Sequence, residues 1–189
     1  MVKLNKIYTR TGDGGETGLA DGSRIAKDHP LAQAIGDVDE LNSALGIAIL
    51  AVTDPGARSM LGRIQNELFD LGADLATPGD DYEPTEMALR MVQSQIDRLE
   101  AEIDRMNEAL DPLRSFILPG GLGGSAELHL ARSIARRAER SVLAAARKVP
   151  FNPLARIYLN RLSDHLFVLC RWLARDQGGD VLWQPGATR

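Results

Sequence analysis

The feature that most constrains the fold is the recurrence of apolar residues at helical spacing along five stretches of the chain. The clearest stretch covers residues 89–110, where steps of three and four separate Leu89, Val92, Ile96, Leu99, Ile103, Met106 and Leu110. Such spacing places the apolar side chains on one face of an α-helix. Further stripes cover 31–53, 57–76, 125–148 and 153–175, and that of 125–148 consists of Leu130, Ile134, Ala138 and Val142.

Helix-breaking residues separate these stripes. They are Asp54-Pro55-Gly56, Thr77-Pro78-Gly79, Pro119 with the glycines up to Gly124, and the Pro150–Pro153 segment. Amphipathic helices with short joints are typical of a helical bundle whose apolar stripes face inward. No run indicates a strand. We therefore predict an all-α five-helix bundle with a glycine-rich N-terminal loop, in a single domain over 1–189 comprising the loop (1–30), the bundle (31–175) and a tail (176–189).

Several sequence features concern the cellular setting. No apolar run is long enough to cross a bilayer, and the N-terminus MVKLNKIYTR lacks a signal-peptide core. The single cysteine, Cys170, excludes an internal disulfide and is typical of a reducing compartment. We therefore expect a cytoplasmic protein without a membrane partner, with Cys170 as a small buried hydrophobic residue.

The charges are segregated along the chain. Residues 54–111 carry a net charge of −9, residues 112–175 one of +8, and the whole chain one of −4. A basic block inside an acidic protein favours a local anionic ligand over nucleic acid, because the overall field repels a long polyanion. The aromatic share of 5% also disfavours a surface on which bases stack. Alternatively, the two blocks neutralise each other, within one chain or between subunits.

The predicted fourth helix contains the densest group of arginines. Arg132, Arg136, Glu139 and Arg140 fall within an arc of roughly 100°, and Arg137 lies at its edge. Guanidinium groups match phosphate oxygens with paired hydrogen bonds, so this face can bind a polyphosphate. Alternatively, these arginines form salt bridges to the acidic third helix.

Two other helices carry polar residues on predicted faces. Asn160 lies between Arg156 and Ser163 along one line of the fifth helix and could face a ligand or form a buried hydrogen bond. In the first helix, Asp37 and Asp39 belong to GDVDELNSALG. Acids in the first turns of a helix can complement the helix dipole, which is the simpler interpretation for Asp37.

The loop YTRTGDGGETGLADG, residues 8–22, has the composition of an anion-binding loop. It is not a Walker A motif. Gly12 and its neighbouring glycines let backbone N–H groups converge, and threonine hydroxyls and the downstream Lys27 add further donors. Alone, such a loop can equally be a turn. Together with the arginine-rich helix it favours a phosphate ligand.

The usual catalytic groups are not arranged for catalysis. Neighbouring residues on a helix point about 100° apart, so Ser163, Asp164 and His165 cannot form a relay. The three histidines are scattered and show no zinc-ligand spacing, so no metal ligands are assigned.

Five segments in order, KIYTRTGDGGETGL, GDVDELNSALG, FILPGG, RRAER and YLNRLSDHLFVLCR, resemble the PduO-type ATP:cob(I)alamin adenosyltransferases. The resemblance covers Lys6 to about Trp183 and implies a homotrimer of five-helix bundles with active sites between subunits. It also implies transfer of the 5′-deoxyadenosyl group of ATP to the cobalt of cob(I)alamin, with release of triphosphate. Mg²⁺ is expected through the ATP phosphates, and a cobalamin reductase and an adenosylcobalamin-dependent enzyme are implied as partners. The alternative function is a non-catalytic module that binds or delivers ATP or a corrinoid.

The resemblance also implies the site residues. The ATP-binding set is Thr9, Arg10, Thr11, Gly12, Thr17, Gly18, Lys27, Arg136, Arg137, Glu139, Arg140 and Asn160. Asp39 and Arg132 correspond to a salt bridge between subunits that shapes the active site, and Arg137 joins them as a catalytic residue. Phe116 corresponds to the aromatic residue that lies over the corrin and helps to exclude the lower axial ligand. The tail around DVLWQPG is not assigned.

Overall fold

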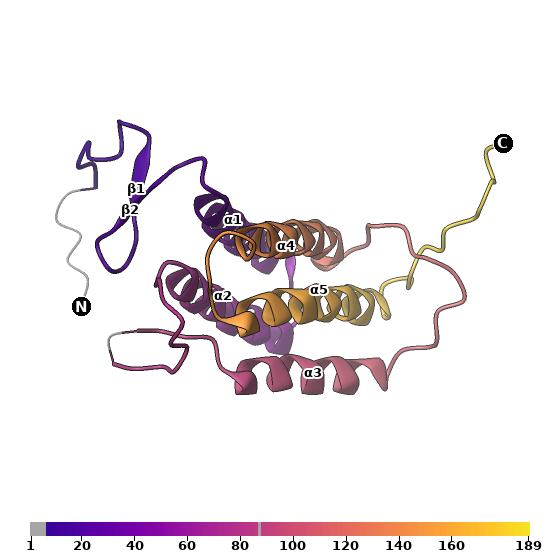
Figure 1. Ribbon diagram of the computed structural model, residues 1–189. Helices are drawn as coiled ribbons and strands as arrows, with labels where there is room; N and C mark the ends of the chain where they lie inside the picture. The colour runs from indigo at the N-terminus through magenta and orange to yellow at the C-terminus, as the bar shows by residue number, and fades with distance from the viewer. Residues whose placement is uncertain (1–6, 87) are drawn as a thin grey trace.

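The computed structural model describes residues 7–86 and 88–189. In this part of the chain the main elements are five long helices: α1 (Pro30–Ala51), α2 (Pro55–Leu75), α3 (Gln93–Asn107), α4 (Ser125–Ala145) and α5 (Pro153–Ala174). They form an elongated bundle, with the N-terminal hairpin at one end and the C-terminal tail leaving from the other (Figure 1). The predicted helical bundle is confirmed.

Local chemistry explains where three helices begin. A proline follows a polar cap residue at the start of α1, α2 and α5. Proline suits this position because its missing N–H would have no partner in the first turn. Asp54 accepts a hydrogen bond from the Ala57 amide at 2.7 Å, and Asn152 accepts one from the Leu154 amide at 3.1 Å. Two of the breakers, Asp54-Pro55-Gly56 and the Pro150–Pro153 segment, thus lie at the starts of α2 and α5.

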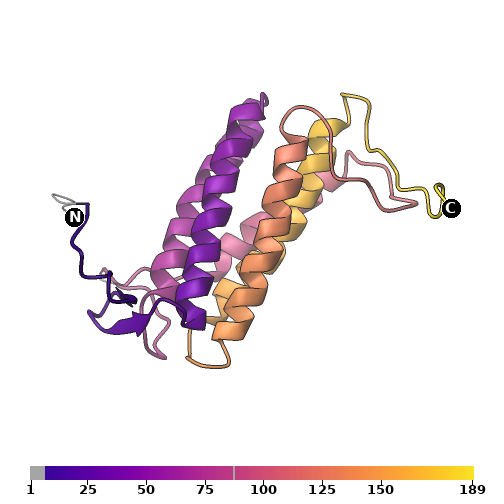
Figure 2. The same ribbon diagram turned by 90° about the horizontal axis from the view of Figure 1, so that it is seen from above.

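The order of packing differs from the order in the chain. Helix α4 lies between α1 and α5, α3 packs on α5, and α2 packs on α1. Figure 2 shows α1 and α4 running along the bundle beside each other. They are antiparallel, because Ser141 near the end of α4 donates to Asp37 near the start of α1. At the opposite end the two helices approach closely: Gly124 has φ 90°, and a Cβ there would lie 2.4 Å from Val52 Cγ2. Only glycine fits this contact.

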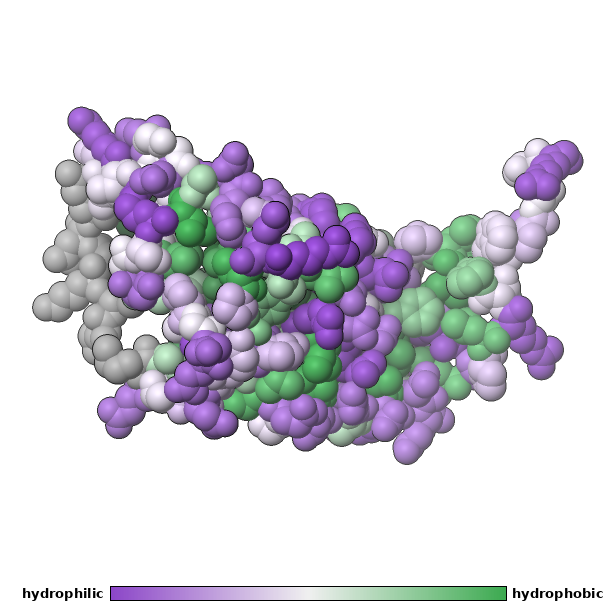
Figure 3. All heavy atoms as spheres, in the orientation of Figure 1, coloured by the Kyte–Doolittle hydropathy of each residue, from purple (hydrophilic) through white to green (hydrophobic). Residues whose placement is uncertain are grey.

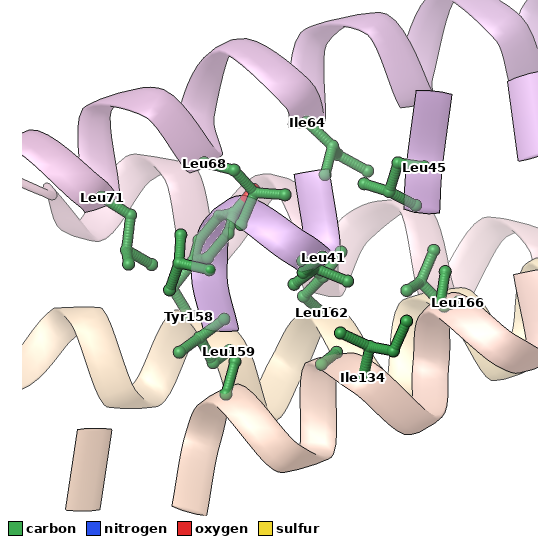
Figure 4. Close-up of a cluster of buried hydrophobic side chains, with 14 of the residues drawn as sticks. Leu41, Leu45, Ile64, Leu68, Leu71, Ile134, Tyr158, Leu159, Leu162 and Leu166 are labelled. Atoms are coloured by element: carbon green, nitrogen blue, oxygen red, sulfur yellow. The ribbon is translucent and has the colours of Figure 1, made fainter. Parts of the chain in front are cut away.

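The core lies between these helices and is mainly aliphatic. Figure 4 shows side chains from α1, α2, α4 and α5 meeting in its centre. Leu41 and Leu45 of α1, and Leu162 of α5, are fully buried. Small residues of α4, such as Ala131 and Ala138, are also fully buried and allow its neighbours to approach.

Three details of the sequence prediction are wrong. Strands β1 (Glu16–Gly18) and β2 (Arg24–Ala26) form an antiparallel hairpin, although no strand was expected. Three residues are too few to show a strand's alternation. Helix α3 begins at Gln93, so Leu89 lies before it and is 56% exposed. Leu130 is 60% exposed, because α4 turns its alanines inward instead.

A buried polar layer joins α2, α3 and α5. Glu67 of α2 accepts hydrogen bonds from Tyr158 of α5 at 2.7 Å and from Arg98 of α3 at 2.9 Å. Glu102 of α3 accepts from Arg63 of α2 at 2.7 Å and is 2.8 Å from His165 of α5. Burial raises the pKa of Glu102, but the His165 hydrogen bond and the Arg63 charge outweigh it and leave the pKa below its ordinary value. The layer fixes α3 against its two neighbours.

The contacts of α3 show how far the acidic block (54–111) and the basic block (112–175) neutralise each other. Arg63 and Arg98, which neutralise the buried glutamates, come from the acidic block itself. From the basic block, Arg161 of α5 pairs with Glu100 of α3 at 2.8 Å. The arginines of α4 do not contribute, because α5 lies between α4 and α3. The alternative that the arginines of the fourth helix form salt bridges to the third helix is therefore wrong.

Candidate active site

The glycine-rich loop is held in shape by its own side chains and by the hairpin. Arg24 of β2 donates to the Thr11 carbonyl at 2.8 Å and pairs with Glu16 at 3.2 Å. The Lys27 amide donates to the Gly15 carbonyl at 2.8 Å. Gly12 lies opposite the Lys27 ammonium, since a Cβ on Gly12 would be 3.1 Å from Nζ. The loop therefore holds a lysine beside its glycine turn.

Turn geometry uses some of the loop's hydrogen-bonding groups. Arg10 has φ 62° and Gly15 has φ 87°, so the chain reverses tightly between them. The amides of Asp13 and Gly15 donate to carbonyls within the loop. The Thr9 and Thr11 hydroxyls are 2.7 Å apart and exposed. An anion at this loop would therefore meet hydroxyls and the Lys27 ammonium as well as backbone amides.

A cavity of about 530 Å³ lies where the hairpin meets α1 and α2. Thr17 and Gly18 line it from β1, Asp39 and Asn42 line it from α1, and Phe69 lines it from α2. The hairpin is docked here by a hydrogen bond from the Ala20 amide to the Ala76 carbonyl at 2.8 Å. The structure thus brings two of the candidate ATP residues to the same cavity as Asp39.

Arg137 of α4 is bound to acidic residues of α1. Its guanidinium donates to Glu40 and lies 3.5 Å from Asp37. The hydrogen bond to Glu40 raises the pKa of Arg137 above its ordinary value. Asp37 is buried in the third turn of α1, where it also accepts from Gln33 at 2.9 Å. Interpreting Asp37 as a partner of the helix dipole is therefore wrong, because α1 begins earlier, at Pro30.

The other candidate residues of α4 lie on its exposed side, next to α5. Glu139 accepts a hydrogen bond from Asn160 of α5 at 3.0 Å. Asn160 is exposed, so it is not the buried polar residue that was the alternative. Arg140 donates to the Arg136 carbonyl at 2.9 Å. Within residues 7–86 and 88–189, neither Arg136 nor Arg140 forms an ion pair.

Arg132 lies further toward the N-terminus of α4, over the ring of Phe167 at 5.9 Å. Its Nε is buried without a hydrogen-bond partner. Burial and the Arg132 charge together lower the pKa of the nearby His129. Asp39, the expected partner of Arg132, is exposed and makes no ion pair with it within this chain. In the part of one copy that the structure describes, neither member of the predicted pair forms an ion pair.

Phe116 lies at the end of the bundle opposite the hairpin and is 78% exposed. Its ring centroid is 6.1 Å from that of Trp183 in the tail. In Figure 3 hydrophobic atoms gather at this end, where the tail leaves the bundle. A cavity of about 440 Å³ lies on the α5 side, lined by Leu113, Phe167 and Arg171 among others.

Within one chain, the glycine-rich loop and Phe116 lie far apart. The hairpin lies beside the start of α1, and Phe116 lies just before α4, whose 21 residues span about 30 Å. Sequence reasoning missed Arg24 and Glu40 as partners of site residues. Glu40 follows Asp39 directly in the sequence, but only the packing of α1 against α4 identifies the arginine that it meets.

The part of the chain that the structure describes contains neither a cluster of metal ligands nor a helix that could span a membrane. No three His, Cys, Asp or Glu side chains between residues 7 and 189, residue 87 aside, lie close enough to hold a metal ion. No helix in the same part of the chain is long and apolar enough to cross a membrane.

The chain matches known proteins over nearly its full length. The family model described as "Cobalamin adenosyltransferase" matches residues 7–173. A corrinoid adenosyltransferase of Mycobacterium leprae is 50% identical over 98% of both chains. One of Mycobacterium tuberculosis is 51% identical, covering 100% of this chain and 97% of the relative. The corrinoid adenosyltransferase PduO of Salmonella typhimurium is 44% identical over 87% of this chain and 48% of its own length.

Solved structures agree with these matches. A variant PduO-type ATP:corrinoid adenosyltransferase from Lactobacillus reuteri, complexed with cobalamin and ATP, superposes with a TM-score of 0.87. It is 36% identical, and the match covers 95% of this chain and 97% of that one. A second variant of this protein, complexed with ATP, has a TM-score of 0.85. The chain therefore belongs to the cobalamin adenosyltransferase family.

Proposed function

We propose that this chain transfers the 5′-deoxyadenosyl group of ATP to the cobalt of cob(I)alamin, forming adenosylcobalamin and releasing triphosphate. The observation that carries the proposal is the family match over residues 7–173. In this reaction the cobalt(I) electron pair forms the bond to C5′, and the C5′–O5′ bond breaks with its electrons passing to the triphosphate. No protein base or nucleophile is needed, in agreement with the lack of a catalytic relay in the sequence.

The chain's contribution would be to bind and orient the two substrates. The loop residues Thr9, Arg10, Thr11 and Gly12, with Lys27, would hold phosphates at one end of the bundle, helped by Thr17 and Gly18. Arg136, Arg137 and Arg140 would offset the charge that accumulates on the leaving triphosphate. Glu139 and Asn160, which are joined by a hydrogen bond, would complete the set of ATP-binding residues. Charge-assisted contacts of this kind are stronger than neutral ones.

Magnesium would enter with ATP, through the phosphates. When bound, it would neutralise part of the phosphate charge. Two acidic residues near the site, Asp37 and Glu40, already bind Arg137.

The arrangement of charges supports a homotrimer with the active site between subunits. Asp39 and Arg132 each lack an ion-pair partner within one described chain, and each could find the other on a neighbouring copy. Exposed apolar residues on α1 and α4, namely Ile47, Leu50 and Leu130, would be covered by that contact. Within one chain the ATP loop and Phe116 lie at opposite ends of the bundle, whereas reacting atoms must approach to about 3–3.5 Å. A site between subunits would bring the loop of one copy near Phe116 of another.

Phe116 would lie over the corrin and exclude the lower axial ligand, favouring a four-coordinate cobalt that is easier to reduce. Its exposed ring at the edge of an apolar region suits contact with a large ligand. A cobalamin reductase would supply cob(I)alamin, and an adenosylcobalamin-dependent enzyme would receive the product. A cytoplasmic location agrees with the free, buried Cys170.

The direct test mixes the protein with MgATP and chemically reduced cobalamin and follows the cobalt(I) absorbance together with triphosphate release. Adenosylcobalamin and triphosphate should form in equal amounts. Binding of both ligands without turnover would instead identify the alternative, a non-catalytic binding or delivery module.

A second experiment tests the shared site. Asp39→Ala and Arg132→Ala variants are each expected to be nearly inactive. When the two are co-expressed, mixed trimers contain some interfaces with both residues intact, so partial activity should return. If the two residues acted within one chain, no mixed site would be intact and activity would stay lost.

A further inference from the structure

Phe116 has little packing of its own to hold it in place. Its side chain is 78% exposed, and it lies in the non-helical connection between α3 and α4. What orders its backbone is the C-terminal tail. The Trp183 amide donates to the Phe116 carbonyl at 2.7 Å, and the Leu118 amide donates to the Val181 carbonyl at 2.8 Å. The tail thus acts as a short strand partner, bridged at Ile117 and Leu182.

A side-chain hydrogen bond extends this pairing. Ser115 Oγ donates to the Trp183 carbonyl at 2.8 Å. The ring of Trp183 lies beside that of Phe116, with a tilt of 52° between their planes. Two short segments that pair only with each other would be marginal in water, since isolated two-stranded pairs are barely stable. Something rigid must therefore anchor them to the bundle.

Arg171 provides that anchor. It lies on α5, and its side chain is 8% exposed. Its Nε is 2.8 Å from Asp180 Oδ2 in the tail, and its Nη2 donates to the Asp111 carbonyl at 2.8 Å. One guanidinium therefore binds both the α3–α4 connection and the C-terminal tail. In each segment the bound residue precedes the residues that pair around Phe116. Its planar fork suits two acceptors at once.

We infer that Arg171 and Asp180 are positioning residues for the corrinoid, because their ion pair fastens the tail against the segment that carries Phe116. This inference rests on the proposed function of Phe116. Neither residue needs to touch the corrinoid. Loss of the ion pair would release the tail and let the exposed Phe116 ring move, while the distant ATP loop would be unaffected.

The test uses Asp180→Ala in the full-length protein, which removes the ion pair but leaves Arg171 bound to the Asp111 carbonyl. We expect KM for cob(I)alamin to rise about tenfold, near the lower end for loss of a charge-assisted hydrogen bond. KM for ATP should not change. Asp180→Asn, which keeps an acceptor for Arg171, should restore part of the affinity. The matched control is Asp176→Ala, which removes an exposed pair with Arg175 in the same tail and should change neither constant.

A second measurement does not depend on activity. In a Trp172→Phe background, Trp183 is the sole tryptophan. Asp180→Ala should increase quenching of Trp183 fluorescence by acrylamide, and Asp176→Ala should not. Unchanged quenching, or an unchanged KM for cob(I)alamin in an active enzyme, would overturn the inference. If the wild-type protein formed no adenosylcobalamin, the proposed function would fail, and the fluorescence comparison would still decide whether the ion pair holds the tail.

Discussion

Replacing Arg137 with alanine separates a structural from a functional role. The structure gives the guanidinium two acidic neighbours, Glu40 and Asp37, and leaves its side chain 42% exposed. Such an ion pair contributes little to stability because water and salt screen it. Asp37 would not be left unpartnered, because it still accepts from Gln33 and Ser141. We therefore expect Arg137→Ala to lower the free energy of unfolding by only about 0.2–1 kcal/mol.

The expected effect on catalysis is larger. A charge-assisted hydrogen bond to the triphosphate is worth about 1.5–3 kcal/mol. Since about 1.4 kcal/mol is a factor of ten in rate, kcat/KM for ATP should fall about 10- to 150-fold. The assay follows adenosylcobalamin formation with varied MgATP at saturating cob(I)alamin, alongside urea unfolding of the same preparations.

Arg161→Ala is the matched control. Arg161 also binds two carboxylates, Glu100 and Asp164, and its side chain is 31% exposed, but it lies between α5 and α3. It should lose similar stability and keep its kcat/KM for ATP. Near-normal kinetics for Arg137→Ala would refute the assignment of Arg137 to the triphosphate. Equal losses of activity in both variants would show that the effect is structural.

Three other predictions concern buried groups. Tyr158→Phe removes the buried hydroxyl from its glutamate and should lower the free energy of unfolding in urea by about 1.5–3 kcal/mol; a similar loss for Tyr82→Phe, at a partly exposed ring, would contradict this. For Glu102, burial raises the pKa but His165 and its neighbours lower it further, so the folded-state pKa lies below the ordinary 4.5. Its stabilisation should be complete above pH 4.5 and lost as the pH falls through the lower folded-state pKa. Between pH 6 and 3, the free energy of unfolding in urea should therefore fall less steeply for Glu102→Gln than for the wild type. Equal slopes for the two proteins would contradict this prediction. Burial raises the pKa of Cys170 to about 12, so an aromatic disulfide reagent should label it only after unfolding, and rapid labelling of the native protein would disprove its burial.

The helices could be predicted because their signals are local. Apolar residues repeat every three or four positions within each helix. A proline that follows a polar cap residue marks the start of α1, α2 and α5. The ordered motifs also identified the family. Errors arose where a local signal was weak or ambiguous. Two three-residue strands have no readable period, and the α4 register depended on choosing Leu130 over the small Ala131.

The partners of the charged residues could not be predicted, because they depend on which helices pack together. The connections at 76–92 and 108–124 are long enough to allow several packing orders. Only the tertiary structure sets α4 against α1, which gives Arg137 the partners Glu40 and Asp37 in place of α3.

The C-terminal tail shows most clearly the difference between what the sequence determines and what only the tertiary structure decides. The sequence alone determined the helices, the loop composition and the arginine-rich face, since each lies within a short span whose residues are neighbours along one element. The tail has no such pattern. Its pairing with the segment around Phe116 joins residues more than 60 positions apart, and Arg171 also reaches the Asp111 carbonyl 60 positions away. Contacts across such separations are decided by how the whole chain packs.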